Sequence, residues 1–180
     1  VLVTGGIHLD GYADTSDALS SYGDREKKLE ILKDPHCGAF AVIRLCTYFL
    51  AYFCVAFCIR FSPRVGLCWT LALVLERGLS GLAAFPMAKN TGLAHTFATA
   101  ADRESVQKIL IVLSVLLAAA LIALGGGALV AAALLVLWRY HHVAVKEFGG
   151  ITGDLAGWFL QKAEFWMLAA LAASQWGGIL

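Results

Sequence analysis

The sequence predicts an all-α protein, a polytopic helical bundle integral to a membrane, with about five transmembrane helices in its 180 residues. Hydrophobic residues make up 59% of the chain and charged residues only 15%, whereas ordinary soluble domains are roughly 45–50% apolar. Several apolar runs are long enough to cross a hydrocarbon core of about 30 Å. The net charge of +1 provides no basic field for nucleic acid. We therefore expect the lipid bilayer as a partner and no nucleic acid.

The spans follow from the apolar runs, which we place at residues 38–59, 65–85, 109–124, 128–145 and 155–176. The run from 109 to 145 would reach about 55 Å as one helix, too long for a bilayer. We therefore divide it at Gly125, Gly126 and Gly127 into a helical hairpin. The five cysteines show no CxxC pairing, so we interpret them as small apolar fillers.

One membrane domain, residues 1–180, accounts for the chain. Residues 1–36 form a cytoplasmic segment, and residues 37–180 form the bundle with cytoplasmic loops 87–108 and 146–154. Lys and Arg concentrate in 20–34, 87–108 and 139–146, which places these parts in the cytoplasm of a cell (inner) membrane protein. The alternating charges of 20–34 favour an amphipathic helix at the membrane surface. Val1–Val3 resemble the tail of an upstream apolar segment, so we expect further N-terminal sequence.

An acidic motif lies near the N-terminus, where Asp10, Asp14 and Asp17 recur at i, i+4 and i+7. On a helix they project within an arc of about 60°. Gathered carboxylates repel one another unless a cation neutralises them, and hard oxygen ligands suit Mg²⁺ or Mn²⁺. The small residues between them leave room for a phosphate. The alternative is a solvated acidic face.

A glycine-rich motif, Gly149 to Asp154, precedes the last span. Gly149, Gly150 and Gly153 permit backbone conformations in which amides point at an anion. Thr152 and Asp154 add a hydroxyl and a carboxylate where the next helix begins. The alternative is a plain turn between helices. With the hairpin division, this motif and the acidic motif lie on the same side of the membrane.

Four further residues carry weaker expectations. Arg77 and Lys33 are candidate phosphate contacts, with snorkelling or surface solvation as the alternative. Glu76 and Arg77 are adjacent in a span. Adjacent residues do not face each other on a helix, so we expect no simple ion pair between them. Two alternatives remain: each side chain contacts a neighbouring helix, or one of them lines a polar cavity. His8 lies about 160° from Asp10 on an ideal helix. It can serve as a base only if the helix begins after it, and is otherwise a structural histidine.

Three segments together resemble the cobalamin synthase family, the adenosylcobinamide-GDP ribazoletransferases: GGIHLDGYADTSDALSS from Gly5, LEILKDPHCGAFAV from Leu29 and GGITGDLAGWFLQKAE from Gly149. The resemblance covers essentially the whole chain. Family members carry additional N-terminal membrane helices. They read Asp-Gly where this chain has Asp17-Ala18, and they place an acid where it has Gln161, whereas Glu164 keeps its acid.

The resemblance implies a phosphoryl transfer in which a ribose hydroxyl of α-ribazole, or of its 5′-phosphate, attacks adenosylcobinamide-GDP and GMP leaves. Such a reaction needs a divalent ion and in-line placement more than a covalent nucleophile. On this basis we assign Asp10, Asp14 and Asp17 to one or two Mg²⁺ ions. Asp154, with Thr152, is the candidate second side of the site, as a further metal ligand or a phosphate contact. His8, Asp14 and Asp154 are the candidate catalytic residues.

Two other functions fit part of the pattern. The acid spacing is similar to that of CDP-alcohol phosphotransferases, but their Ala-Arg pair is replaced here by Tyr12-Ala13. A small transporter would use Glu76, Arg77 and Glu164 along its path, yet it would not need three acids clustered outside the spans. GMP release separates these functions, because a transporter yields none and a CDP-alcohol enzyme releases CMP.

Overall fold

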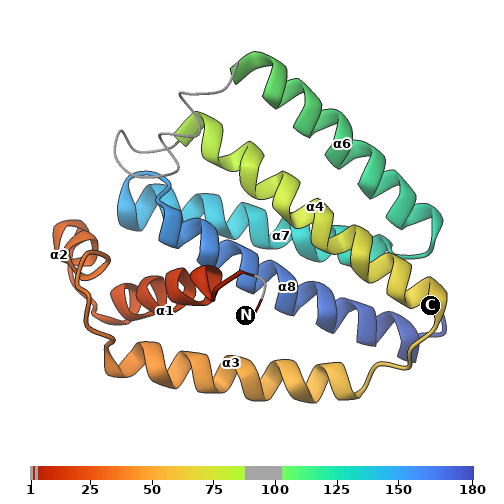
Figure 1. The fold of residues 1–180 in the computed structure, drawn as a ribbon, viewed down its shortest axis with the longest axis horizontal. Coiled ribbons are helices and arrows are strands. Elements are labelled where there is room, and N and C mark those ends of the chain that lie inside the picture. The colour runs from red at the N-terminus through yellow and green to blue at the C-terminus, as the bar shows by residue number, and fades with distance from the viewer. Residues whose placement is uncertain (1, 3, 88–102) are drawn as a thin grey trace.

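A computed structural model describes residues 2, 4–87 and 103–180, and all regular structure in these residues is helical. The helices are α1 (Ile7–Ser20), α2 (Arg25–Ile31), α3 (Ala39–Phe57), α4 (Pro63–Met87), α6 (Arg103–Ala123), α7 (Gly127–Val143) and α8 (Gly153–Trp176), with a π-helical turn η1 (Ala144–Phe148) after α7 (Figure 1). The all-α prediction is confirmed.

Four helical segments are long and apolar enough to cross a membrane: Ala39–Phe57, Pro63–Ala84, Glu104–Ala123 and Gly127–Phe148. The predicted fifth span forms a helix, α8, of 24 residues. It is not among the four, because Gln161, Lys162 and Glu164 interrupt its apolar sequence. The multi-pass character of the protein is confirmed, with four apolar spans around a more polar fifth helix.

The hairpin division at the glycines is confirmed. Gly125 turns the chain with a φ of 86°, and the Gly126 amide donates to the Leu121 carbonyl at 2.7 Å. Helix α6 begins at Arg103 rather than at residue 109, so it is longer than its apolar run. Most of the predicted loop 87–108, with Lys89, His95 and Asp102, lies outside the described residues.

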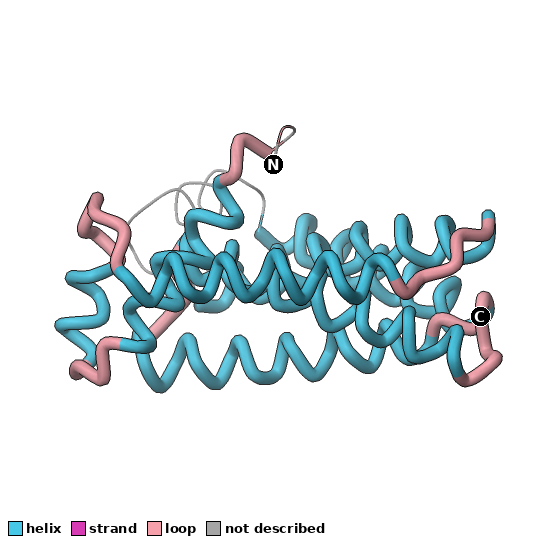
Figure 2. The backbone as a smooth tube through the Cα atoms, turned by 90° about the horizontal axis from the view of Figure 1, so that it is seen from below, coloured by secondary structure: helices cyan, strands magenta, loops and turns pink. Residues whose placement is uncertain are grey.

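The long helices run roughly parallel or antiparallel along the long axis of the molecule, as Figure 2 shows. Helix α8 occupies the centre, where it contacts α1, α3, α4 and α7. Helices α3 and α6 lie at opposite edges (Figure 1), and only 11% of each apolar segment is buried. The end of α1, the ends of α4 and α7 and the beginnings of α3, α6 and α8 share one end of the bundle (Figure 1). We call it the motif end.

The predicted amphipathic helix over 20–34 is largely wrong, because only the seven residues of α2 are helical there. Tyr22 adopts a φ of 54°, which ends the preceding helical segment. Asp24 then begins α2 by accepting a hydrogen bond from the Lys27 amide at 2.9 Å. The resulting short helix packs against α1 and η1.

Candidate functional site

Glycines bring the acidic motif and the glycine-rich motif into backbone contact. A Cβ atom on Gly11 would lie 2.7 Å from the Asp154 carbonyl oxygen, and one on Gly157 would lie 3.0 Å from the His8 carbonyl oxygen. Only residues without a side chain permit such an approach. Helix α1 is therefore fixed against the first turns of α8, and α1 and α8 form the most extensive helix pair in the described chain.

Carboxylates gather where these two helices meet. The pKa of Asp14 is raised to about 6 because its carboxyl is partly buried and because Asp10, Asp154 and Asp17 place negative charge beside it. Burial also raises the pKa of Asp154, with a smaller contribution from Asp10. Acids from two motifs about 140 residues apart in the sequence thus lie close enough to influence Asp14.

A cleft of about 630 Å³ opens beside this carboxylate cluster, which we define as Asp10, Asp14, Asp17 and Asp154. Asp10 and Asp14 line the cleft, and Asp34 contributes a third acid from the segment after α2. The remaining lining residues are Gly5, Gly6, Ile7, Leu9, Ala13, Pro35, His36, Cys37 and Leu45. The cleft is large enough for a phosphate-bearing group to reach the acids.

Asp17 has a different environment from the other acids. Its Oδ1 accepts a hydrogen bond from the Ala41 amide at 3.3 Å, in the first turn of α3. Gly38, the residue before α3, supplies no cap of its own, and a Cβ atom there would overlap the Asp17 carboxylate. Asp17 therefore caps α3 from a neighbouring helix, where a negative charge is favoured.

The four side chains of this cluster offer only carboxylate oxygens, so the question is whether a hard divalent cation fits them. Within the described residues, no group of three or more His, Cys, Asp or Glu side chains is arranged so that it could hold a metal ion. The neighbouring donors are nevertheless all carboxylate oxygens, the ligands that Mg²⁺ prefers. The negative charges of the neighbouring carboxylates raise the pKa of Asp14. A bound cation would relieve this repulsion.

The glycine-rich motif forms the turn between η1 and α8. Gly149 and Gly150 adopt φ values of 70° and 152°, which favour glycine. The Thr152 hydroxyl accepts a hydrogen bond from the Leu155 amide at 3.3 Å and caps α8. This arrangement agrees with the alternative of a plain turn between helices, in which the Thr152 side chain caps α8. Contact of Gly149, Gly150, Thr152 or Gly153 with an anion stays a prediction.

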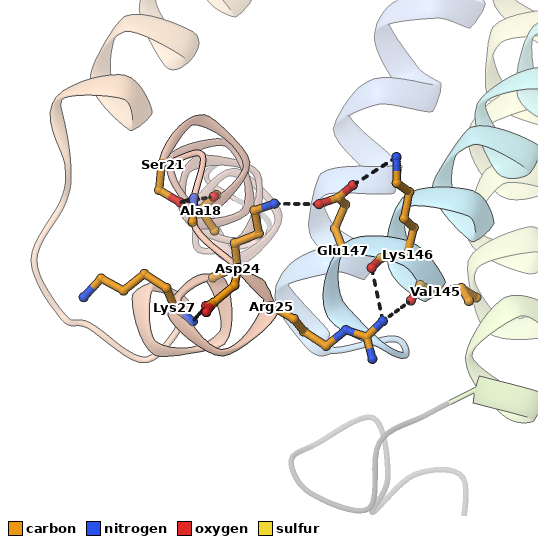
Figure 3. A network of polar contacts seen from close by, with 10 residues as sticks. Ala18, Ser21, Asp24, Arg25, Lys27, Val145, Lys146 and Glu147 are labelled. Atoms are coloured by element: carbon orange, nitrogen blue, oxygen red, sulfur yellow. Dashed lines mark hydrogen bonds and ion pairs between the residues drawn. The ribbon is translucent and has the colours of Figure 1, made fainter.

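The π-helical turn η1, which precedes the glycine-rich motif, is held in place by α2, as Figure 3 shows. Arg25 donates from Nη2 to the Val145 and Lys146 carbonyl oxygens, each at 3.2 Å. Lys28 pairs with Glu147 at 2.5 Å, and its side chain is only 11% exposed. The sequence alone does not distinguish Arg25 or Lys28 from their neighbours, because a row of alternating charges gives no sign of which members are buried.

His8 lies apart from the cleft. The helix begins at Ile7, so the condition under which His8 could act as the base is not met, and this expectation is corrected. His8 instead lines a second cavity of about 240 Å³ with Tyr52, Gln161 and Glu164, and burial lowers its pKa. Tyr52 donates to Glu164 there at 3.1 Å.

Arg77 also lines this second cavity, which bears out the expectation that one of the two charged residues in the span faces a polar cavity. The expectation that Glu76 and Arg77 form no pair is wrong, because the long arginine folds back to contact the Glu76 carboxylate and the Leu73 carbonyl. Arg77 does not line the cleft beside Asp10 and Asp14. Lys33 lies exposed beside Asp34 on the turn after α2.

The fold and the site together define a class, a multi-pass helical membrane protein with a carboxylate cluster at one end of its bundle. A family model described as cobalamin-5-phosphate synthase matches residues 1–172. The chain belongs to this cobalamin-5-phosphate synthase family.

Relatives in this family bear a common name. The chain is 42% identical over 177 residues to the adenosylcobinamide-GDP ribazoletransferase of Lachnoclostridium phytofermentans, a match covering 96% of this chain and 66% of that protein. It is 35% identical over 176 residues to the one from Pseudomonas savastanoi pv. phaseolicola, covering 96% and 71%. The chain thus spans about two thirds of the length of these relatives. No solved structure matches it significantly.

Proposed function

We propose that this chain carries the catalytic region of an adenosylcobinamide-GDP ribazoletransferase, acting in a late step of cobalamin synthesis. Its substrates are adenosylcobinamide-GDP and α-ribazole or its 5′-phosphate, and its products are adenosylcobalamin or its 5′-phosphate and GMP. Family membership and the names of the relatives support this activity. The observation that carries it is the meeting of acids from α1 and α8 beside a cleft.

The reaction is a phosphoryl transfer. A ribose hydroxyl oxygen bonds to the cobinamide-side phosphorus, the bond from that phosphorus to the GMP oxygen breaks, and the hydroxyl proton leaves. Asp10, Asp14 and Asp154 would hold Mg²⁺ or Mn²⁺, with Asp17 as a further candidate at the edge of the cluster. When bound, the ion neutralises the pyrophosphate and the charge that develops on the leaving group.

The chain's own residues orient the substrates and accept the proton. The cleft beside Asp10 and Asp14 admits the phosphates and holds the hydroxyl in line with the leaving group. With His8 in the other cavity, the proton acceptor falls to a carboxylate. Asp14 is our candidate, because its carboxylate lines the cleft that would hold the hydroxyl and a base must lie within hydrogen-bond reach of the proton it accepts.

The motif end faces the cytoplasm of the cell (inner) membrane in this proposal. Arg25, Lys27, Lys28, Lys33 and Lys146 all belong to segments at this end. Cytoplasmic segments of membrane proteins carry an excess of such residues, which supports the orientation.

The test uses membranes containing the full-length parent protein, supplied with adenosylcobinamide-GDP and α-ribazole, with and without Mg²⁺. We expect Mg²⁺-dependent release of GMP and formation of cobalamin. Asp14→Asn should lower the rate on the order of a hundredfold, whereas Glu30→Gln, an exposed acid on α2, should leave it unchanged. Well-folded protein that releases no GMP, or that instead releases CMP from a CDP-alcohol, would overturn the proposal.

A further inference from the structure

A groove of about 570 Å³ runs between α7 and α8, separate from both cavities described above. Its polar lining consists of Arg139 and Lys162, and its apolar lining includes Leu135, Trp138, Trp158 and Trp166. The groove faces outward, because Trp138 is 70% exposed, Leu135 67% and Trp166 52%. Apolar side chains left open in this way on helices of a membrane bundle face the hydrocarbon of the bilayer.

The cations of the groove have no anionic partner in the described part of the chain. Lys162 lies over the rings of Tyr12 and Trp158, with its Nζ 5.5 Å and 5.9 Å from their centroids. None of the ion pairs among the described residues involves Arg139 or Lys162. Positive charge on membrane-embedded helices requires an anion or a polar surface.

The two cations lie at matching depth. Lys162 follows the first residue of α8 by nine positions and Arg139 precedes the last residue of η1 by nine, so each lies about 14 Å from the motif end along its helix. Leu135 and Trp166 lie one helical turn further from that end. Along the groove, the two cations therefore lie nearer the motif end than Leu135 and Trp166 do.

We propose that this groove binds an anionic phospholipid of the leaflet at the motif end. Arg139 and Lys162 hold the headgroup phosphate, and an acyl chain lies along Leu135, Trp138 and Trp166. A phospholipid has the same polarity along its length as the groove, and basic pockets between membrane helices are recognised sites for anionic headgroups. None of the four cluster acids lines the groove, and the proposal stands whether or not the proposed enzymatic function is correct.

The test uses the full-length parent in detergent micelles containing dioleoylphosphatidylglycerol or, at the same mole fraction, dioleoylphosphatidylcholine. Bound lipid is counted by native mass spectrometry and the unfolding midpoint is measured. We expect retention of phosphatidylglycerol and a higher midpoint with it alone. Arg139→Gln and Lys162→Gln should each weaken its apparent affinity about fivefold. Lys162→Arg should restore it.

Lys108→Gln is the matched control, because Lys108 is an exposed lysine on α6 paired with Glu104; it should bind the lipid as the parent does. If a groove cation proves necessary for folding, Leu135→Ala tests the apolar wall at an exposed position and should also weaken binding. Equal retention of phosphatidylcholine overturns the proposal. Phosphatidylglycerol binding that is unaffected by Arg139→Gln, Lys162→Gln and Leu135→Ala also overturns it. Equal stabilisation by millimolar inorganic phosphate would identify a small-anion site instead. A dimer that dissociates on Arg139→Gln would identify a second copy as the occupant.

Discussion

At the scale of single residues, the acids of the cluster oppose one another. Asp14 is the one whose ionised form is most disfavoured, because burial and three neighbouring carboxylates all raise its pKa. A group whose pKa rises on folding costs stability when the pH lies above its folded pKa. The native protein is therefore destabilised near neutral pH by the residue that we propose for catalysis.

Asp14→Asn should consequently stabilise the protein while it lowers activity. We expect an unfolding midpoint about 2–4 °C higher at pH 7.5 in the presence of EDTA, after allowance for solvent screening of a partly exposed carboxyl. Differential scanning fluorimetry of the two proteins measures it. Mg²⁺ should stabilise the parent more than the variant. A lower midpoint for the variant in EDTA would contradict the repulsion described here.

Gly11 offers a second test at this scale. Gly11→Ala should cost about 1–3 kcal/mol of stability, because the new methyl would meet the Asp154 backbone at 2.7 Å. It should also lower activity by separating Asp10 and Asp14 from Asp154. Gly127→Ala is the matched control, since nothing lies within 4 Å of a Cβ atom there. Denaturation midpoints and GMP release measure both effects; equal behaviour of the two variants would contradict the close approach of α1 and α8.

Sequence spacing was sufficient to propose the residues of the carboxylate cluster but not their separate environments. The i, i+4, i+7 pattern predicts one face for Asp10, Asp14 and Asp17. Periodicity cannot reveal that the last of these caps α3, because that contact depends on where another helix begins. The starting residue of α1 likewise determines whether His8 can serve as the base. Helix boundaries are the least certain part of any sequence-based assignment.

At the scale of elements, the short helix α2 depends on tertiary contacts. Seven residues are too few for a stable isolated helix, so the contacts of Arg25 with η1 and the Lys28–Glu147 pair supply its stability. These contacts also explain why the amphipathic pattern of residues 20–34 overestimated the helix. Charge alternation was interpreted as a membrane surface, whereas part of it faces the protein.

Lys28→Ala should therefore loosen α2 without unfolding the bundle. Loss of a partly buried ion pair of about 1–2 kcal/mol predicts amide exchange in α2 and η1 that is about 5–30 times faster. Hydrogen-exchange mass spectrometry of these peptides measures it. Lys27→Ala is the control, because the Lys27 side chain is 58% exposed and its loss should change little. Uniform acceleration throughout the protein would contradict a local role.

At the scale of the whole molecule, the alternation of helices sets which segments share an end. The division at Gly125–Gly127 brought the acidic and glycine-rich motifs to the same end, and length alone was enough to predict it. The position of α1 between α3 and α8 was not predictable, because its glycines are compatible with many partners and only packing selects one.

The orientation of the bundle is testable with the two ends of α3. Cys37 precedes this helix and Cys58 follows it, and both are free and exposed. In variants that retain one of these cysteines, a membrane-impermeant maleimide should label Cys58 in intact spheroplasts and Cys37 only in inside-out vesicles. The reverse pattern would contradict a cytoplasmic motif end, and labelling of both from one side would contradict α3 as a span.

The two edge helices, α3 and α6, should tolerate more amino-acid substitutions than the centre of the bundle. The outward faces of α3 and α6 need only be apolar, since lipid does not distinguish leucine from valine or phenylalanine. Exchange among apolar residues should therefore leave function intact along most of α3 and α6, whereas α8, buried against four other helices, should accept few changes of shape. A saturation mutagenesis experiment on cobalamin-dependent growth would show two tolerant helices and one intolerant helix between them.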